Sequence, residues 1–281
     1  MEIWKSTQEA KARLRPLQAQ GIHVGLVPTM GALHAGHLSL VAEAKRRAEV
    51  VVASIFVNPM QFGPNEDFQR YPRDLEGDAK KLESAGCDAI YAPEVSDVYP
   101  EGFQTAVEVS GVTQGLCGAV RPGHFRGVTT VVLKLFNVVA PKVAVFGEKD
   151  FQQLTVLRTM ARDLALDVEI VGAPLMRESD GLAMSSRNAY LSPVDRSQAL
   201  SLSRGLAAAA ERYAGGEREA SVLLATARSA LDQAGLVPEY LELRSFVDLR
   251  PLDRADVPAV MLVAARVGKT RLIDNWILAR P

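Results

Sequence analysis

Short hydrophobic runs alternate with segments of helical periodicity along the first two thirds of the chain. The hydrophobic runs predict buried β-strands at 24–27, 50–56, 89–91, 143–146 and 167–171. Apolar residues spaced three or four positions apart predict helices at 37–48, 74–84, 128–139 and 151–164. Strands that are apolar throughout and alternate with helices are typical of a parallel sheet covered by helices on both faces.

The last third of the chain has a different pattern. A segment with Gly, Pro and Ser at 172–193 precedes two predicted helices, which Gly215 and Gly216 separate. Three short strands are then predicted at 240–244, 260–267 and 271–277, the last two joined as a hairpin. We therefore expect a Rossmann-like α/β domain at 1–176, followed by a smaller α+β domain at 177–281.

Composition and charge narrow the possible classes of function. The 281 residues include 48% hydrophobic and 23% charged residues, with a net charge of −1, so the chain can fold around a core and has no excess of cations for nucleic acid. The first 20 residues contain no apolar signal segment, and no run reaches the roughly 20 apolar residues of a membrane span. Cys87 and Cys117 form no CxxC pair. We expect a cytoplasmic protein that binds small molecules.

Two common nucleotide-binding motifs are absent from the sequence. Gly268-Lys269-Thr270 resembles the end of a P-loop, but Val263 stands where that motif requires glycine. Gly31 and Gly36 are five residues apart, which does not match the GxGxxG pattern of dinucleotide-binding proteins. A nicotinamide-dependent dehydrogenase is therefore disfavoured.

The turn after the strand at 24–27 carries the first candidate site. Ligands of open α/β sheets bind where such a strand leads into a helix, and a helix N-terminus attracts phosphate. His34 and His37 lie in this turn, and Gly31 and Gly36 let the backbone approach a ligand. A single histidine could simply cap or pack, but two of the chain's four within four residues favour a functional role. A zinc site is disfavoured, because it needs three or four ligands and no HExxH motif is present.

Two further segments contain charged and hydroxyl groups suited to a polyphosphate. Met184-Ser185-Ser186-Arg187-Asn188 offers two hydroxyls and a guanidinium in a predicted loop. Gly147-Glu148-Lys149-Asp150 follows a predicted strand and places Lys149 at the carboxyl edge of the sheet. Each segment alone also fits a simpler interpretation, a solvated loop in the first case and a charged helix start in the second.

Together these segments carry a family resemblance. Residues 30–37 resemble the HxGH signature of HIGH-type nucleotidyltransferases, and Met184-Ser185-Ser186-Arg187 resembles their KMSKS-type loop. Five longer strings resemble the pantothenate synthetase family: VPTMG at 27–31, FVNPMQF at 56–62, RPGHFRG at 121–127, FGEKDFQQ at 146–153 and DGLAMSSRN at 180–188. They cover the first two thirds in the family's order, whereas the last third has no comparable motif.

The resemblance implies a ligase that joins pantoate to β-alanine and converts ATP to AMP and pyrophosphate through a pantoyl-adenylate. It also implies Mg²⁺ accompanying ATP, with no protein metal ligand named, and a homodimer without nucleic-acid or membrane partners. The implied catalytic residues are His34, His37, Lys149 and Arg187, with His37 as proton donor. Removal of one such group is expected to slow the reaction on the order of a hundredfold.

Binding residues also follow from the resemblance. The implied ATP contacts are Met30, Gly31, Ala32, Leu33, His34, Ala35, Gly36, His37, Gly147, Glu148, Lys149, Asp150, Met176, Met184, Ser185, Ser186 and Arg187. The implied pantoate-binding residues are Gln61 and Gln153, and Gln61 should also face β-alanine. Their amides both donate and accept, which suits hydroxyls and a carboxylate.

An acyl-adenylate must be shielded from water, so we expect a lid at 58–73 or at the loop around Ser185. Ala183 precedes Met184 where the KMSKS motif has a lysine, which leaves Arg187 as the evident cation of that loop. Two alternatives stay open. One is a nucleotidyltransferase that adenylylates a phosphate instead of a carboxylate, and the other is a non-catalytic nucleotide- or RNA-binding module.

Overall fold

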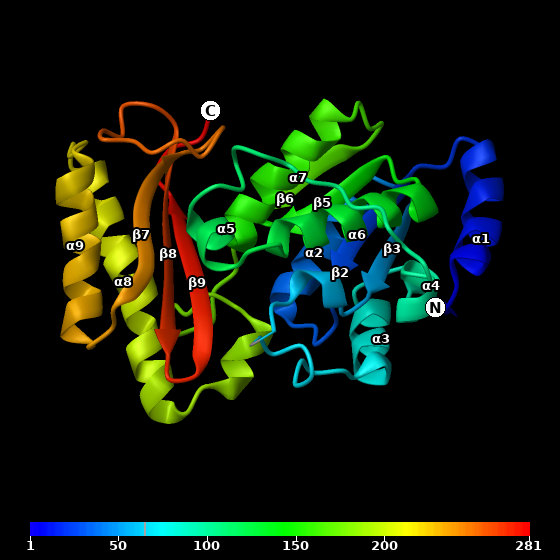
Figure 1. Cartoon of the computed structure of the whole chain (residues 1–281), viewed down its shortest axis with the longest axis horizontal. Coiled ribbons are helices and arrows are strands. Elements are labelled where there is room, and N and C mark those ends of the chain that lie inside the picture. The colour runs from blue at the N-terminus through cyan, green and yellow to red at the C-terminus, as the bar shows by residue number, and fades with distance from the viewer. Residues whose placement is uncertain (65) are drawn as a thin grey trace. The chain divides into compact units, whose positions relative to one another are not determined.

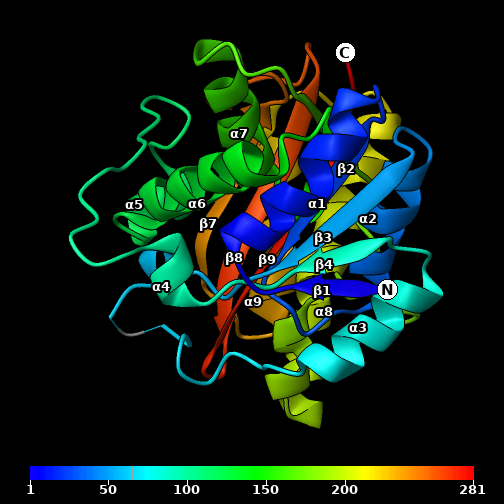
Figure 2. The ribbon, with the colours of Figure 1, turned by 90° about the vertical axis from the view of Figure 1, so that its right-hand side faces the viewer.

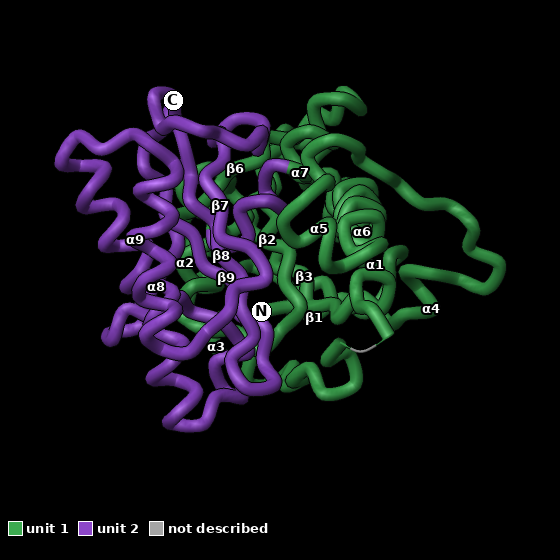
Figure 3. Tube along the Cα trace, turned by 60° about the vertical axis from the view of Figure 1, so that its left-hand side comes forward, with its two compact units in different colours: residues 1–148, 156–174 green, residues 149–155, 175–281 purple. Residues whose placement is uncertain are grey.

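The computed structural model describes residues 1–64 and 66–281. These residues divide into two compact units (Figure 3). Unit 1 contains residues 1–148 and 156–174, and unit 2 contains residues 149–155 and 175–281. The functional division expected at 176/177 stays a prediction. None of the helices in the described part of the chain combines the length and apolar character needed to cross a bilayer.

Unit 1 is built on a six-stranded sheet in which all neighbouring strands are parallel, in the order β1-β4-β3-β2-β5-β6. Figure 1 labels β2, β3, β5 and β6, and Figure 2 labels β1 and β4. Its strands are β1 (Glu2–Trp4), β2 (Val24–Thr29), β3 (Val50–Ile55), β4 (Ala89–Tyr91), β5 (Val143–Gly147) and β6 (Glu169–Ala173). β2 and β3 are almost entirely buried, as the apolar runs predict for strands covered on both faces.

Helices lie on both faces of this sheet (Figure 2). α1 (Thr7–Ala19) packs against α6 (His124–Val139) on one face, and α2 (Ala35–Lys45) contacts α3 (Leu75–Ser84) on the other. Two short helices, α4 (Val95–Val98) and α5 (Leu116–Val120), lie in the connection between β4 and α6. α7 (Phe151–Asp163) joins β5 to β6. The predicted Rossmann-like α/β fold is confirmed.

Several boundaries differ from those predicted. The sequence pattern missed β1 and α1: β1 is a three-residue edge strand, and α1 has a low proportion of apolar residues. α6 begins at His124 instead of 128, because Gly123 takes a left-handed conformation (φ 78°) that separates the helix from the preceding turn. α2 begins at Ala35 instead of 37, because His34 acts as its N-cap.

Unit 2 has the predicted order of two helices and three strands. α8 (Pro193–Ala214) and α9 (Ala220–Gln233) pack together and are followed by β7 (Pro238–Ser245), β8 (Ala259–Val267) and β9 (Thr270–Ile277). The strands form an antiparallel sheet in the order β7-β8-β9, and the predicted β8–β9 hairpin is confirmed. The core between helices and sheet contains buried leucines and alanines from α8 and α9 and apolar residues of β8.

Candidate active site

The turn between β2 and α2 is held in an unusual backbone conformation. Gly31 and Ala32 have positive φ values of 84° and 51°, which is favourable for glycine and costly for alanine. The carboxylate of Asp78, on α3, accepts hydrogen bonds from the backbone amides of Ala32 (2.7 Å) and Leu33 (2.8 Å). These two bonds stabilise the strained turn and fix the approach of the chain to α2.

Asp78 is a site residue that the sequence analysis missed. Its side chain is 1% exposed, and the ammonium group of Lys81 lies 3.4 Å from one carboxylate oxygen. In sequence it appears as one of several charged residues of an ordinary amphipathic helix. Only the long-range packing of α3 beside the turn reveals that it binds backbone amides.

The two histidines at the start of α2 cap this helix reciprocally. Nδ1 of His34 accepts from the Gly36 amide (3.2 Å), and Nδ1 of His37 accepts from the His34 amide (3.3 Å). The two rings lie 4.1 Å apart between centroids. A nitrogen that accepts carries no proton, so in this geometry each neutral ring carries its proton on Nε2. The positive end of the helix dipole adds to the attraction for a phosphate.

Gln61 lies close to the same turn in unit 1. Its Nε2 is 3.3 Å from Sδ of Met30, and its Oε1 accepts from Nδ2 of Asn58 (2.9 Å). Asn58 is 1% exposed, and its Oδ1 accepts from the hydroxyl of Tyr99 (2.8 Å). Because Asn58 occupies the amide oxygen of Gln61, the amide nitrogen is left on the side of Met30 and acts as a donor there.

A charged cluster supports the backbone of Gln61. Arg121 donates to both carboxylate oxygens of Glu66, at 2.6 and 2.8 Å, and Nδ1 of His124 lies 2.9 Å from the carbonyl of Gln61. Burial alone raises the pKa of Glu66, but Arg121, the Gly63 amide and nearby His124 outweigh burial and lower this pKa from 4.5 to about 2. The carboxylate is therefore ionised throughout the neutral range.

We expect Glu66→Gln to lower the melting temperature at pH 7 by roughly 2–4 °C, the effect of about 1 kcal/mol for a partly exposed ion pair. Because the folded-state pKa lies below its ordinary value, this stabilisation is complete above pH 4.5 and is lost as the pH falls towards about 2. Melting curves at pH 7, 4.5 and 2.5 measure it. Glu76→Gln, an exposed residue paired with Lys80, is the control. A difference that stays constant down to pH 2.5 would contradict the assignment.

The predicted segment 147–150 crosses from one unit to the other. Gly147 and Glu148 end β5 in unit 1, and Glu148 is 3% exposed. Because β5 is parallel to β2, both strands end at the same edge of the sheet, where the histidine turn begins. Lys149, Asp150 and Gln153 belong to unit 2, and the carboxylate of Asp150 lies 3.8 Å from Nζ of Lys149.

The second predicted loop lies in unit 2 and is locally ordered. Arg177 and Ala183 form an antiparallel bridge, and the amide of Met184 donates to the carbonyl of Met176 (3.0 Å). Ser185 then caps a turn of 3₁₀ helix (Ser186–Tyr190), because its Oγ accepts from the Arg187 amide (3.2 Å). The sequence predicted an irregular loop here, and the serine cap is the reason for the short helix.

Unit 1 thus brings together Met30, the histidine turn, Gln61 and the end of β5, whereas unit 2 carries Lys149, Gln153 and the segment from Met176 to Arg187. That both sets contact one nucleotide stays a prediction, as does the lid at 58–73, which includes residue 65 outside the described part of the chain. Across residues 1–64 and 66–281, no group of three or more His, Cys, Asp and Glu side chains is arranged to hold a metal ion.

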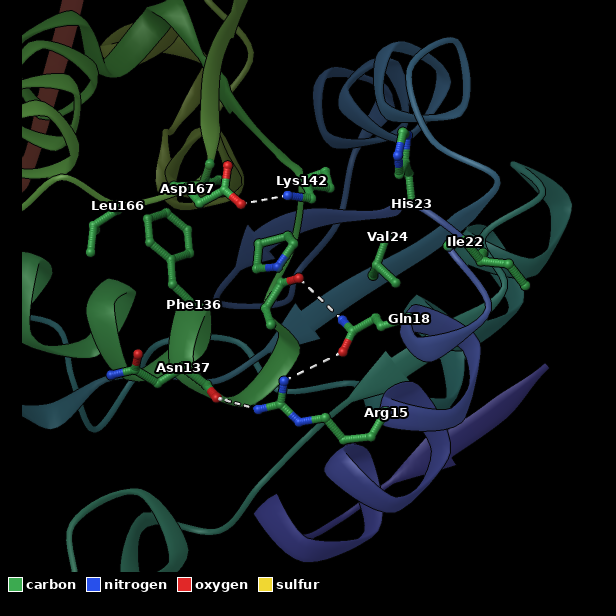
Figure 4. A pocket seen from close by; sticks show the side chains of 14 residues that line it. Arg15, Gln18, Ile22, His23, Val24, Phe136, Asn137, Lys142, Leu166 and Asp167 are labelled. Carbon is green, nitrogen blue, oxygen red and sulfur yellow. Dashed lines mark hydrogen bonds and ion pairs between the residues drawn. The ribbon is translucent and has the colours of Figure 1, made fainter.

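A cavity of about 450 Å³ lies at the opposite edge of the unit 1 sheet, where β2 and β5 begin (Figure 4). Its polar groups already bind one another: Nε2 of Gln18 donates to the carbonyl of Ala140 (3.1 Å), and Lys142 pairs with Asp167 (2.5 Å). The residues predicted to bind ATP or substrates are not among those that line it. We therefore do not assign this cavity to the candidate active site.

Comparison with known sequences supports one family. A sequence profile of the family described as pantoate-beta-alanine ligase matches residues 2–277. A pantothenate synthetase from Citrifermentans bemidjiense is 57% identical over 256 residues, which cover 91% of this chain and 92% of that protein. Another from Myxococcus xanthus is 56% identical over 279 residues, 98% of this chain and 96% of that protein.

Solved structures give the same result. A pantothenate synthetase of Thermus thermophilus superposes with a TM-score of 0.95 at 48% identity and covers both chains completely. The pantoate-beta-alanine ligase of Francisella tularensis superposes with a TM-score of 0.83 at 33% identity, over 99% of this chain and 98% of that one. The Francisella structure is described as a complex with beta-gamma ATP and beta-alanine.

Proposed function

The chain belongs to the pantoate-beta-alanine ligase family, and from this membership we propose how its residues carry out the reaction. The enzyme is a ligase that condenses pantoate with β-alanine and converts ATP to AMP and pyrophosphate. Among the site's features, the reciprocal histidine cap at the start of α2 carries the proposal for this chain, because it places two imidazole rings at the helix N-terminus, at the carboxyl edge of the sheet.

In the first step, the pantoate carboxylate attacks the α-phosphorus of ATP, and the bond to pyrophosphate breaks. Two anions approach each other in this step, so the site must supply positive potential and hydrogen-bond donors without a nucleophile of its own. We assign His34 and His37 to the phosphates, with Lys149 and Arg187 as the cations and Ser185 and Ser186 as hydroxyl donors. His37 supplies the donor that neutralises charge on the transferring phosphate.

In the second step, the amine of β-alanine attacks the acyl carbon of pantoyl-adenylate and AMP leaves. Gln61 and Gln153 hold pantoate, and Gln61 presents an amide donor because Asn58 occupies its oxygen. The remaining ATP contacts are assigned to the backbone of residues 30–37, 147–150 and 176, and to Met184. The segment 58–73 is proposed to shield the adenylate from water.

The residues present also bear on Mg²⁺ and on the compartment. Asp78, a carboxylate beside the turn, already binds two backbone amides, so we propose that Mg²⁺ binds mainly through the ATP phosphates.

We propose a reducing compartment, the cytoplasm, because Cys87 and Cys117 are buried free thiols. A homodimer is proposed from family membership alone. Residues 1–176 are proposed to bind ATP and pantoate, and 177–281 to supply the serine–arginine segment.

Product analysis tests the proposed reaction. We expect AMP release to require pantoate and β-alanine together, and we expect pantoate alone to support exchange of labelled pyrophosphate into ATP. Exchange that requires a phosphate acceptor instead of pantoate would favour the rival nucleotidyltransferase. Binding of nucleotide without AMP release and without pyrophosphate exchange would favour a non-catalytic module.

A further inference from the structure

Strand β9 of unit 2 carries two adjacent polar side chains that are buried in the protein. Asp274 is 3% exposed and Asn275 is 4% exposed. Neighbouring residues of a strand point to opposite faces of a sheet, so this pair can contact two different segments. Buried polar groups are costly unless they are bonded, which makes their partners informative.

Asp274 binds the base of the serine–arginine segment. Its two carboxylate oxygens accept from Arg177 at 2.7 and 3.0 Å, and the guanidinium of Arg177 lies 5.2 Å from the ring centroid of Trp276. Arg177 also donates to the carbonyl of Gly181 (3.1 Å), inside the turn that leads to Met184. A bidentate arginine–carboxylate pair has a defined geometry, so β9 fixes where this turn begins.

Asn275 binds the backbone of Lys149. Its Nδ2 donates to the carbonyl oxygen of Lys149 (2.9 Å), at the point where the chain leaves β5 and enters α7. Phe151 is 1% exposed and makes an edge contact with Phe246, with 5.0 Å between ring centroids. Within unit 2, the Lys149 backbone is therefore held to β9 by a directional bond, and the aromatic contact of Phe151 holds the start of α7 beside it.

We infer that Asp274 and Asn275 are positioning residues that attach Lys149 and the Met184–Arg187 segment to one strand, so that both groups of phosphate ligands keep a fixed geometry. The inference rests on the function proposed above for Lys149 and Arg187. It assigns a role to the C-terminal sheet, in which the sequence showed no motif. Neither residue is assigned a contact with the substrate. Each acts through the segment that it holds.

A double-mutant cycle on Asn275 and Lys149 tests this inference, with kcat of pantoate-dependent pyrophosphate exchange as the readout. In the otherwise unchanged enzyme we expect Asn275→Ala to lower kcat about tenfold, because a displaced cation loses most of its contribution, while KM for pantoate changes less than about twofold. In the Lys149→Ala background we expect Asn275→Ala to cause less than about a twofold further loss, since the group that it positions is already absent.

A purely structural role gives a different result. If Asn275 only stabilises the fold, its substitution lowers kcat by the same factor in both backgrounds, and this outcome would overturn the inference. Asn275→Leu, which keeps most of the volume but lacks the donor, repeats the test should the alanine variant fold poorly. Arg271→Ala is the matched control on β9, because it removes an ion pair with Glu239 and is expected to leave kcat unchanged.

The same cycle separates this inference from the proposed function. If Lys149→Ala alone retains full exchange activity, the catalytic role of Lys149 is wrong, and the inference fails with it. If Lys149→Ala is impaired and the effects of the two substitutions simply multiply, the catalytic role stands and only the positioning role of Asn275 is wrong.

Discussion

His37→Ala is expected to lower pantoate-dependent pyrophosphate exchange by about a hundredfold to a thousandfold, the loss typical for one donor that stabilises a transition state. The substitution removes the imidazole that we assign to the transferring phosphate, and it also removes the Nδ1 acceptor of the His34 amide. The first effect acts on the transferring phosphate, so kcat should fall more than the affinity for ATP.

The fold should survive this change, because His37 lies at a helix end, where one lost cap costs about 1 kcal/mol. Circular dichroism and the melting temperature check this point. His23→Ala is the matched control: His23 belongs to the same unit, is 57% exposed and approaches Glu49 at 4.0 Å, so its loss should leave exchange unchanged. Near-normal exchange by His37→Ala would remove the histidine from the mechanism.

The central strands of the unit 1 sheet followed from the apolar pattern because they are buried on both faces. β3 consists of apolar residues apart from Ser54, and such a run leaves few alternatives. β1 and α1 gave no comparable signal. β1 contains three residues with one buried side chain, and α1 buries only Ala10 and Leu14 on an otherwise mostly polar helix. In both cases tertiary contacts supply the stability that the local sequence does not indicate.

The candidate site residues also differ in whether the local sequence indicates them. His34, His37 and Lys149 could be proposed from sequence because they follow strands of a parallel sheet, a position that depends on local sequence. Asp78, Asn58 and Asp274 were not found, because each acts on a segment far away in sequence. An aspartate on a helix such as α3 appears the same in sequence whether it faces water or binds two amides, and only the packing separates these cases.

Asp78→Ala should therefore have the largest effect on stability. It leaves the amides of Ala32 and Leu33 without their acceptor in a buried turn, and each such loss costs about 1–3 kcal/mol. We expect the free energy of unfolding in urea to fall by about 2–5 kcal/mol. We also expect exchange to slow, because a turn with Ala32 at φ 51° relaxes towards ordinary backbone angles and moves His34 and His37 with it.

Asp74→Ala at the start of the same helix is the matched control for this result. Asp74 caps α3 through the Gly77 amide (2.9 Å), a bond within its own helix, so its removal should cost about 1 kcal/mol and leave exchange unchanged. Asp78→Asn should fall between the two, since its single amide oxygen can accept from one backbone N–H while its NH₂ group opposes the other. If Asp78→Ala unfolds at the same urea concentration as Asp74→Ala and exchanges normally, the carboxylate does not hold the turn.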